Sequence, residues 1–176
     1  MANKRLEVLV VDDSLNQQEA AERQFSKEDA QKKYNLHLAQ DYQTATRMIR
    51  KDHYDALLTD LFFPFGSDEE GKTYPITEEE ARKPEPLGHA LALEGLANGI
   101  RKIAVVSMEN HHNGALAASY ERLENFKYPL RKMSDNLYVG ATNEYPSHPN
   151  DKNWLKLLEI MLENKESGGK EDGKNN

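Results

Sequence analysis

Five short apolar runs alternate with stretches of helical periodicity, and this alternation constrains the fold of the chain more than any other feature. The runs are too short for stable helices and are rich in Val, Leu and Ala, which is typical of strands buried on both faces. Strands separated by helices predict a parallel sheet with right-handed crossovers. The predicted strands are Leu6–Val11, Leu36–Ala39, Ala56–Thr59, Ile103–Val106 and Leu137–Val139. We therefore expect a doubly wound α/β domain, a five-stranded parallel sheet with helices on both faces.

The predicted helices are recognised by apolar residues that recur at helical spacing. Ser14 and Gln17 have the spacing of a capping box, and the helix that they open is expected to continue to about Gln31. Further helical faces are predicted at Tyr42–Ile49, His89–Asn98, Leu116–Leu123 and Trp154–Met161. Gly99 is expected to end the helix before it, since glycine favours the backbone conformation that terminates helices.

The length of 176 residues, with 38% hydrophobic content, predicts one well-buried core. We expect a single domain over residues 1–165, followed by a polar, glycine-rich tail at 166–176 that is too hydrophilic to fold. The segment Phe65–Pro86 does not fit the alternation, because it carries three prolines, two glycines and many acids. It is interpreted as a long insertion with a helical turn at Thr77–Arg82, and loops of this length are usually functional or disordered.

Charge and composition narrow the class of partner. The net charge of −7 and the pI of about 5.4 disfavour nucleic-acid binding, which needs clustered Lys and Arg, and they favour a protein partner. The chain has no cysteine, so it forms no disulfides. Its first residues enter a strand without a signal-peptide segment, and no run is long enough to span a membrane. These features predict a cytoplasmic protein with no membrane partner.

Acidic residues close two of the predicted strands. Asp12 and Asp13 follow the first strand, and Asp60 follows the third. If these strands are neighbours, the three carboxylates meet at one edge of the sheet, where ligands bind in open parallel sheets. Carboxylates so close repel one another unless a cation lies among them. Mg²⁺ prefers oxygen ligands, so the pattern predicts a magnesium site, although three ordinary surface carboxylates are the simpler alternative.

Three segments resemble the receiver domain of two-component response regulators. They are VLVVDDS at Val8–Ser14, LLTDLFFP at Leu57–Pro64 and AVVS at Ala104–Ser107. The acidic pair alone is a weak signal, whereas the three segments together are much more specific. The likeness extends from Leu6 to about Leu162, without the insertion. It implies a flavodoxin-like fold with strand order 2-1-3-4-5.

The resemblance also implies roles for particular residues. Asp60 would accept a phosphoryl group, and Ser107 would bond one of its oxygens. Mg²⁺ would be held by Asp12, Asp13, Asp60 and the backbone carbonyl of Phe62. The partners would be a sensor histidine kinase or phosphotransfer protein and a downstream protein target. Such a domain is a phosphoacceptor and not an enzyme in the usual sense, and here it is expected to stand alone without an output domain.

One feature of the family is missing from the predicted fifth strand. Receivers carry a lysine at the end of that strand, which pairs with the phosphoryl group. In this chain the position falls near Ala141 or on Tyr145, depending on the register, and neither is a lysine. The nearest substitute cations along the chain are His111 and His112, which follow Ser107, although a polar, solvated turn is the simpler explanation of them.

Two other functions remain open from the residues. The first is a pseudo-receiver that binds proteins without being phosphorylated. The second is a small hydrolase of the phosphoaspartyl kind, which is disfavoured because such enzymes place a second Asp two residues after the nucleophile. That position is Phe62 here.

Overall fold

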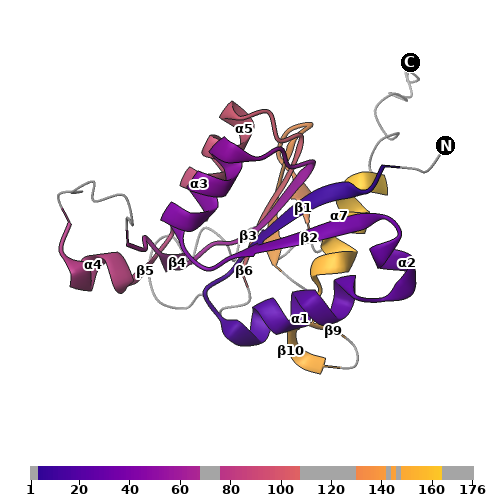
Figure 1. The fold of residues 1–176 in the computed structure, drawn as a ribbon, viewed down its shortest axis with the longest axis horizontal. Helices are drawn as coiled ribbons and strands as arrows, with labels where there is room; N and C mark the ends of the chain where they lie inside the picture. Colours follow the sequence, from indigo (N-terminus) through magenta and orange to yellow (C-terminus); the bar gives the residue numbers. More distant parts are fainter. Residues whose placement is uncertain (1–3, 68–75, 108–129, 142–143, 146–147, 164–176) are drawn as a thin grey trace, which may run out of the picture.

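A six-stranded sheet forms the centre of the protein (Figure 1). The computed structural model describes residues 4–67, 76–107, 130–141, 144–145 and 148–163. In spatial order the strands are β2 (Tyr34–Ala39), β1 (Leu6–Val11), β3 (Ala56–Asp60), β6 (Lys102–Ser107), β8 (Leu137–Ala141) and β7 (Arg131–Lys132). The first five are parallel, which confirms the predicted sheet and its order, and β7 adds an antiparallel edge.

Helices cover both faces of this sheet (Figure 1). On one face α3 (Tyr42–Lys51) and α5 (Gly88–Ala97) pack over a core that includes Leu9 and Val11. On the other, α1 (Leu15–Phe25) and α7 (Trp154–Glu163) pack over a core that includes Val8 and Val10. Successive residues of β1 therefore enter opposite cores, which explains why the strand is apolar without alternation.

Two expectations for the first helix are wrong. The Ser14 side chain makes no capping hydrogen bond, and the Gln17 side chain bonds to a distant strand. The helix also ends at Phe25, and a separate short helix, α2 (Glu28–Gln31), follows it. A side-chain cap is present at α3, where the Asp41 carboxylate accepts from the Thr44 amide at 2.8 Å. Gly99, at φ 85°, follows α5 as predicted.

The two ends of the insertion pack against the domain. Thr77 caps α4 (Glu78–Arg82) through a complete capping box with Glu80, close to the predicted helical turn. The strands β4 (Phe63–Pro64) and β5 (Pro84–Glu85) pair antiparallel and close the segment. Phe65 stacks on Tyr42 with ring centroids 5.5 Å apart. The start of the segment is therefore part of the packed domain.

A small hairpin comes between β8 and α7 in the chain and packs against α1. It consists of β9 (Glu144–Tyr145) and β10 (His148–Lys152), which pair with each other in a sheet of their own. The predicted helix at Leu116–Leu123 and the tail at 166–176 lie outside the described residues. Among the helices that are described, none combines the length and apolarity needed to cross a membrane.

Candidate functional site

The carboxyl ends of β1 and β3 bring the three predicted acids together. The strands are parallel neighbours, with Val11 opposite Thr59, so the residues that follow them share one edge of the sheet. One carboxylate oxygen from each of Asp12, Asp13 and Asp60 lies within 4.8 Å of the others. Asp12 and Asp60 are buried and Asp13 is exposed. The result is a cluster of three acids, called the acidic pocket below, in which Asp13 is the exposed member.

A lysine lies inside this acidic pocket, although the predicted fifth strand carries none. The Lys152 ammonium is 2.5 Å from Asp12 Oδ2 and 2.6 Å from Asp60 Oδ1. Its side chain is only 5% exposed. Lys152 is the last residue of β10 and therefore comes from the hairpin, beyond both positions considered in the sequence. An internal ammonium thus bridges two buried carboxylates.

Burial and proximity shift the pKa values of this cluster. Burial raises the pKa of Asp60 to about 6; Lys152 acts against this rise, and Asp12 adds to it. Burial alone would lower the pKa of Lys152, but attraction to Asp60 and Asp12 and hydrogen bonds to both outweigh it, so this pKa is raised. The ammonium therefore stays charged, and the raised pKa lets Asp60 take up a proton in mildly acidic solution.

Neighbouring groups bond to Asp12 and pack closely against Asp60. The Ser14 amide donates to Asp12 Oδ1 at 2.9 Å, and the Gln18 side chain donates to the Asp12 carbonyl at 2.7 Å. Gly88 begins α5 directly against the end of β3, where its amide donates to the Leu61 carbonyl at 3.0 Å. A Cβ at Gly88 would lie 2.4 Å from the Asp60 carbonyl oxygen, so only glycine fits there.

The remaining predicted site residues are placed as follows. Ser107 is buried and ends β6, the strand next to β3, at the same edge of the sheet as Asp60. Phe62 follows Asp60 by two residues, and its side chain packs partly buried against the core. His111 and His112 lie outside the described residues. With Lys152 in the pocket, the reason for proposing them as the cation no longer holds.

The insertion contributes to the surroundings of the acidic pocket. A hollow beside Asp13 is lined on its other side by α4 and by the residues just after β4. Its lining residues are Asp13, Gln40, Asp41, Pro64, Gly66, Ser67, Glu78, Ala81 and Arg82. The exposed member of the acidic pocket, Asp13, therefore faces the insertion.

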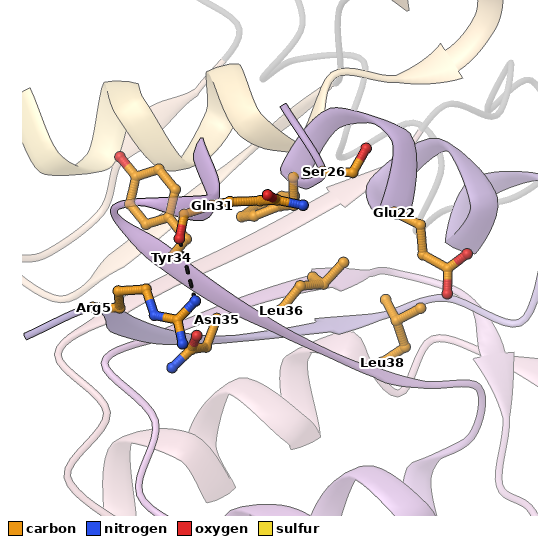
Figure 2. A pocket seen from close by; sticks show the side chains of 9 residues that line it. Arg5, Glu22, Ser26, Gln31, Tyr34, Asn35, Leu36 and Leu38 are labelled. Carbon is orange, nitrogen blue, oxygen red and sulfur yellow. Dashed lines mark hydrogen bonds between the residues drawn. The ribbon is translucent and has the colours of Figure 1, made fainter. Parts of the chain in front are cut away.

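A second hollow lies against β2, the edge strand of the sheet (Figure 2). Figure 2 shows Leu36 and Leu38 of β2 with Glu22 of α1, and the Arg5 guanidinium donates to the Gln31 carbonyl at 3.3 Å. The charged side chains that line this second hollow, Arg5 and Glu22, are exposed to solvent. The acidic pocket, where carboxylates and an ammonium are buried together, is the better candidate for chemistry.

The donor set of the acidic pocket fits a magnesium ion. Three carboxylates offer hard oxygen ligands within a span that one small ion can bridge, and the exposed Asp13 leaves room for water. Lys152 engages only one carboxylate oxygen of Asp12 and one of Asp60. Asp12, Asp13 and Asp60 are the residues that could hold the ion.

Sequence reasoning identified the acids and missed the lysine. The acids follow apolar strands, which is a local signal. Lys152 stands among polar residues before α7, and nothing in that stretch distinguishes it from the other lysines. Repulsion among the acids does predict a cation, but it does not predict which residue supplies it.

Comparisons with solved structures bear on the fold. RcsB from Salmonella enterica serovar Typhimurium, bound to promoter rprA in the presence of phosphomimetic BeF3-, matches with a TM-score of 0.51 and 14% identity, over 90% of this chain and 99% of that chain. The N-terminal domain of a response regulator/sensory box/GGDEF 3-domain protein from Carboxydothermus hydrogenoformans matches with a TM-score of 0.50 and 12% identity, over 89% and 94%.

No protein-family model and no curated protein matches the chain. A second structure of the Salmonella typhimurium RcsB response regulator matches with a TM-score of 0.51 and 13% identity, over 92% of this chain and 62% of that chain. The fold is therefore that of response regulator receiver domains, as the sequence predicts.

Proposed function

We propose that this protein is a receiver that accepts a phosphoryl group on Asp60 in a Mg²⁺-dependent reaction and signals by a change in protein binding. The observation that carries the proposal is the Lys152 ammonium, 2.6 Å from Asp60 Oδ1 in a pocket with three carboxylates. A nucleophilic carboxylate, a cation beside it and a donor set for a metal are the parts that phosphoryl transfer needs. A histidine kinase or phosphotransfer protein is the natural donor, and acetyl phosphate serves as its small substitute.

In the proposed reaction, an Asp60 carboxylate oxygen attacks the phosphorus of the donor. A new O–P bond forms as the bond between phosphorus and the leaving group breaks, so acetate leaves when acetyl phosphate is the donor. Lys152 pairs with the oxygens of the transferred group, and the Ser107 hydroxyl donates to one of them. Asp12, Asp13 and Asp60 would hold Mg²⁺, which would supply charge neutralisation during the transfer. The phosphoryl group carries close to two negative charges in place of the single charge of the Asp60 carboxylate, and it attracts Lys152 away from Asp12.

A phosphorylation-independent pseudo-receiver is the second candidate, and one observation favours it. Lys152 already neutralises part of the charge of the acidic pocket without a phosphoryl group. Its ion pairs with Asp12 and Asp60 would then serve only to stabilise the fold. The two candidates differ in whether Asp60 is reactive.

Mass spectrometry of the protein after incubation with acetyl phosphate and Mg²⁺ separates them. We expect one phosphoryl adduct on Asp60, which disappears in Asp60→Asn and when Mg²⁺ is chelated. Mg²⁺ alone should raise the melting temperature, because a ligand that binds only the native state stabilises it by about 2.7 kcal/mol at a concentration of 100 times its Kd. Asp13→Ala should remove that rise. An intact protein without an adduct would favour the pseudo-receiver.

A further inference from the structure

The position of Lys152 is not set by the central sheet. Lys152 belongs to β10, which pairs with β9 in a separate two-stranded sheet. An ammonium on a flexible side chain bridges Asp12 and Asp60 only if its own backbone is held at a fixed distance from them. The contacts that hold this backbone therefore decide whether the pocket contains a cation.

Two glutamines of α1 make those contacts. Gln17 Oε1 accepts from the Lys152 amide at 2.8 Å, while Gln17 Nε2 donates to the Asn150 carbonyl at 2.8 Å. Gln24 Nε2 donates to the Lys152 carbonyl at 2.8 Å, and Gln24 Oε1 accepts from the Leu155 amide at 3.0 Å. Both peptide groups of Lys152 are thus bonded to amide side chains of one helix.

Burial and chemistry make this arrangement specific. The Gln24 side chain is buried, at 2% exposed, where an unsatisfied amide would be costly. Each glutamine uses its donor and its acceptor at once, which a carboxylate cannot do. The same helix also holds Asp12, one of the two acids that pair with Lys152, since the Gln18 side chain donates to the Asp12 carbonyl at 2.7 Å. One helix therefore fixes the ammonium and one of its partners relative to each other.

We propose that Gln17 and Gln24 are positioning residues that set the Lys152 ammonium between Asp12 and Asp60. Their effect on phosphoryl transfer rests on the proposed function, but their effect on the place of the ammonium does not. Glutamate at either position keeps an acceptor and loses the donor, and its carboxylate then faces a backbone carbonyl. The strand carrying Lys152 moves away from α1, and the ammonium leaves the acidic pocket.

The direct test measures how fast the Lys152 amine reacts with an N-hydroxysuccinimide ester, followed by peptide mapping. In the unchanged protein the buried, ion-paired amine should react slowly. Gln17→Glu and Gln24→Glu should each increase its rate about tenfold, the equivalent of one lost hydrogen bond. Lys156, whose side chain is 55% exposed, is the internal reference, and its rate should not change in a folded variant. Gln31→Glu, at an exposed position in α2, is the matched control.

A second measurement uses phosphorylation of Asp60 by acetyl phosphate. Both glutamate variants should slow it about tenfold, and neither should slow it further in a Lys152→Met background, because they act through the lysine. Gln17→Ala, at a half-buried position, replaces any glutamate variant that fails to fold.

The outcomes separate this inference from the proposed function. Unchanged labelling of Lys152 in folded variants overturns the positioning role, and so do additive effects in the Lys152→Met background. Faster labelling in a protein that never accepts a phosphoryl group supports the positioning role and rejects the proposed function.

Discussion

The two halves of the acidic pocket are built in different ways. The carboxylate half comes from the ends of neighbouring parallel strands, where the sheet itself places Asp12 and Asp60 side by side. The ammonium half comes from a hairpin outside the main sheet, which side chains of α1 hold in place. Strand pairing fixes the first half through many backbone hydrogen bonds, whereas a few long-range contacts fix the second. The same fold can therefore keep its acids while obtaining its cation from a different element.

The largest expected effect comes from removing the ammonium. Lys152→Met leaves two buried carboxylates without their cation, so the free energy of unfolding of the metal-free protein should fall by about 3–5 kcal/mol. Urea denaturation measures this loss. Lys156→Met, on the exposed side of α7, should change stability by no more than about 0.5 kcal/mol. Equal effects of the two substitutions would show that the hairpin half contributes little to the pocket.

A smaller effect is expected from the pH dependence of the carboxylate half. The folded pKa of Asp60 is raised to about 6, above the ordinary value of about 3.9 for aspartate. The folded state therefore binds this proton more tightly, and the stabilisation that the proton gives is complete below about pH 4 and is lost as pH rises through about 6.

Asp60→Asn removes this titration and should gain stability relative to the unchanged, metal-free protein as pH rises across that window. The gain should reach roughly 3 kcal/mol at most, from the size of the pKa shift. Denaturant unfolding at several pH values measures it. A stability difference that stays constant with pH would mean that Lys152 cancels the effect of burial on Asp60.

The smallest expected effect compares two helix starts that look alike in sequence. Asp41→Ala should destabilise the protein by about 1 kcal/mol, because its carboxylate caps α3. Ser14→Ala should change stability by only a few tenths of a kcal/mol, since its side chain makes no capping bond. Thermal unfolding of both variants checks the pair. A larger loss for Ser14→Ala would show that α1 depends on its own start and not on the hairpin.

Local patterns predicted most of the fold. The five parallel strands and their order follow from short apolar runs that alternate with helices, and these signals are contained within each segment. The edge strand β7 was not predicted, because two residues carry no periodicity. The end of α1 at Phe25 was missed because that helix is only weakly amphipathic, so nothing in the pattern marks the boundary before Lys27.

The candidate site was predictable only on its carboxylate side. Asp12, Asp13 and Asp60 each follow a predicted strand, so topology alone brings them together. Lys152 depends on hydrogen bonds to Gln17, far away in the chain, and sequence reasoning assigned that glutamine to a capping box. A local interpretation of one side chain thus concealed a long-range contact.

The chain contains a single tryptophan, and its place gives the pocket an optical signal of its own. Trp154 is fully buried, and its indole nitrogen donates to the Gln17 carbonyl at 3.2 Å. The Lys152 ammonium lies 5.2 Å from the centre of the ring, within the range of a cation–π interaction. The wavelength of indole fluorescence emission shifts when a nearby charge moves relative to the ring. Any event that draws the ammonium toward a new anion is therefore visible as a shift in the emission of one unlabelled chromophore.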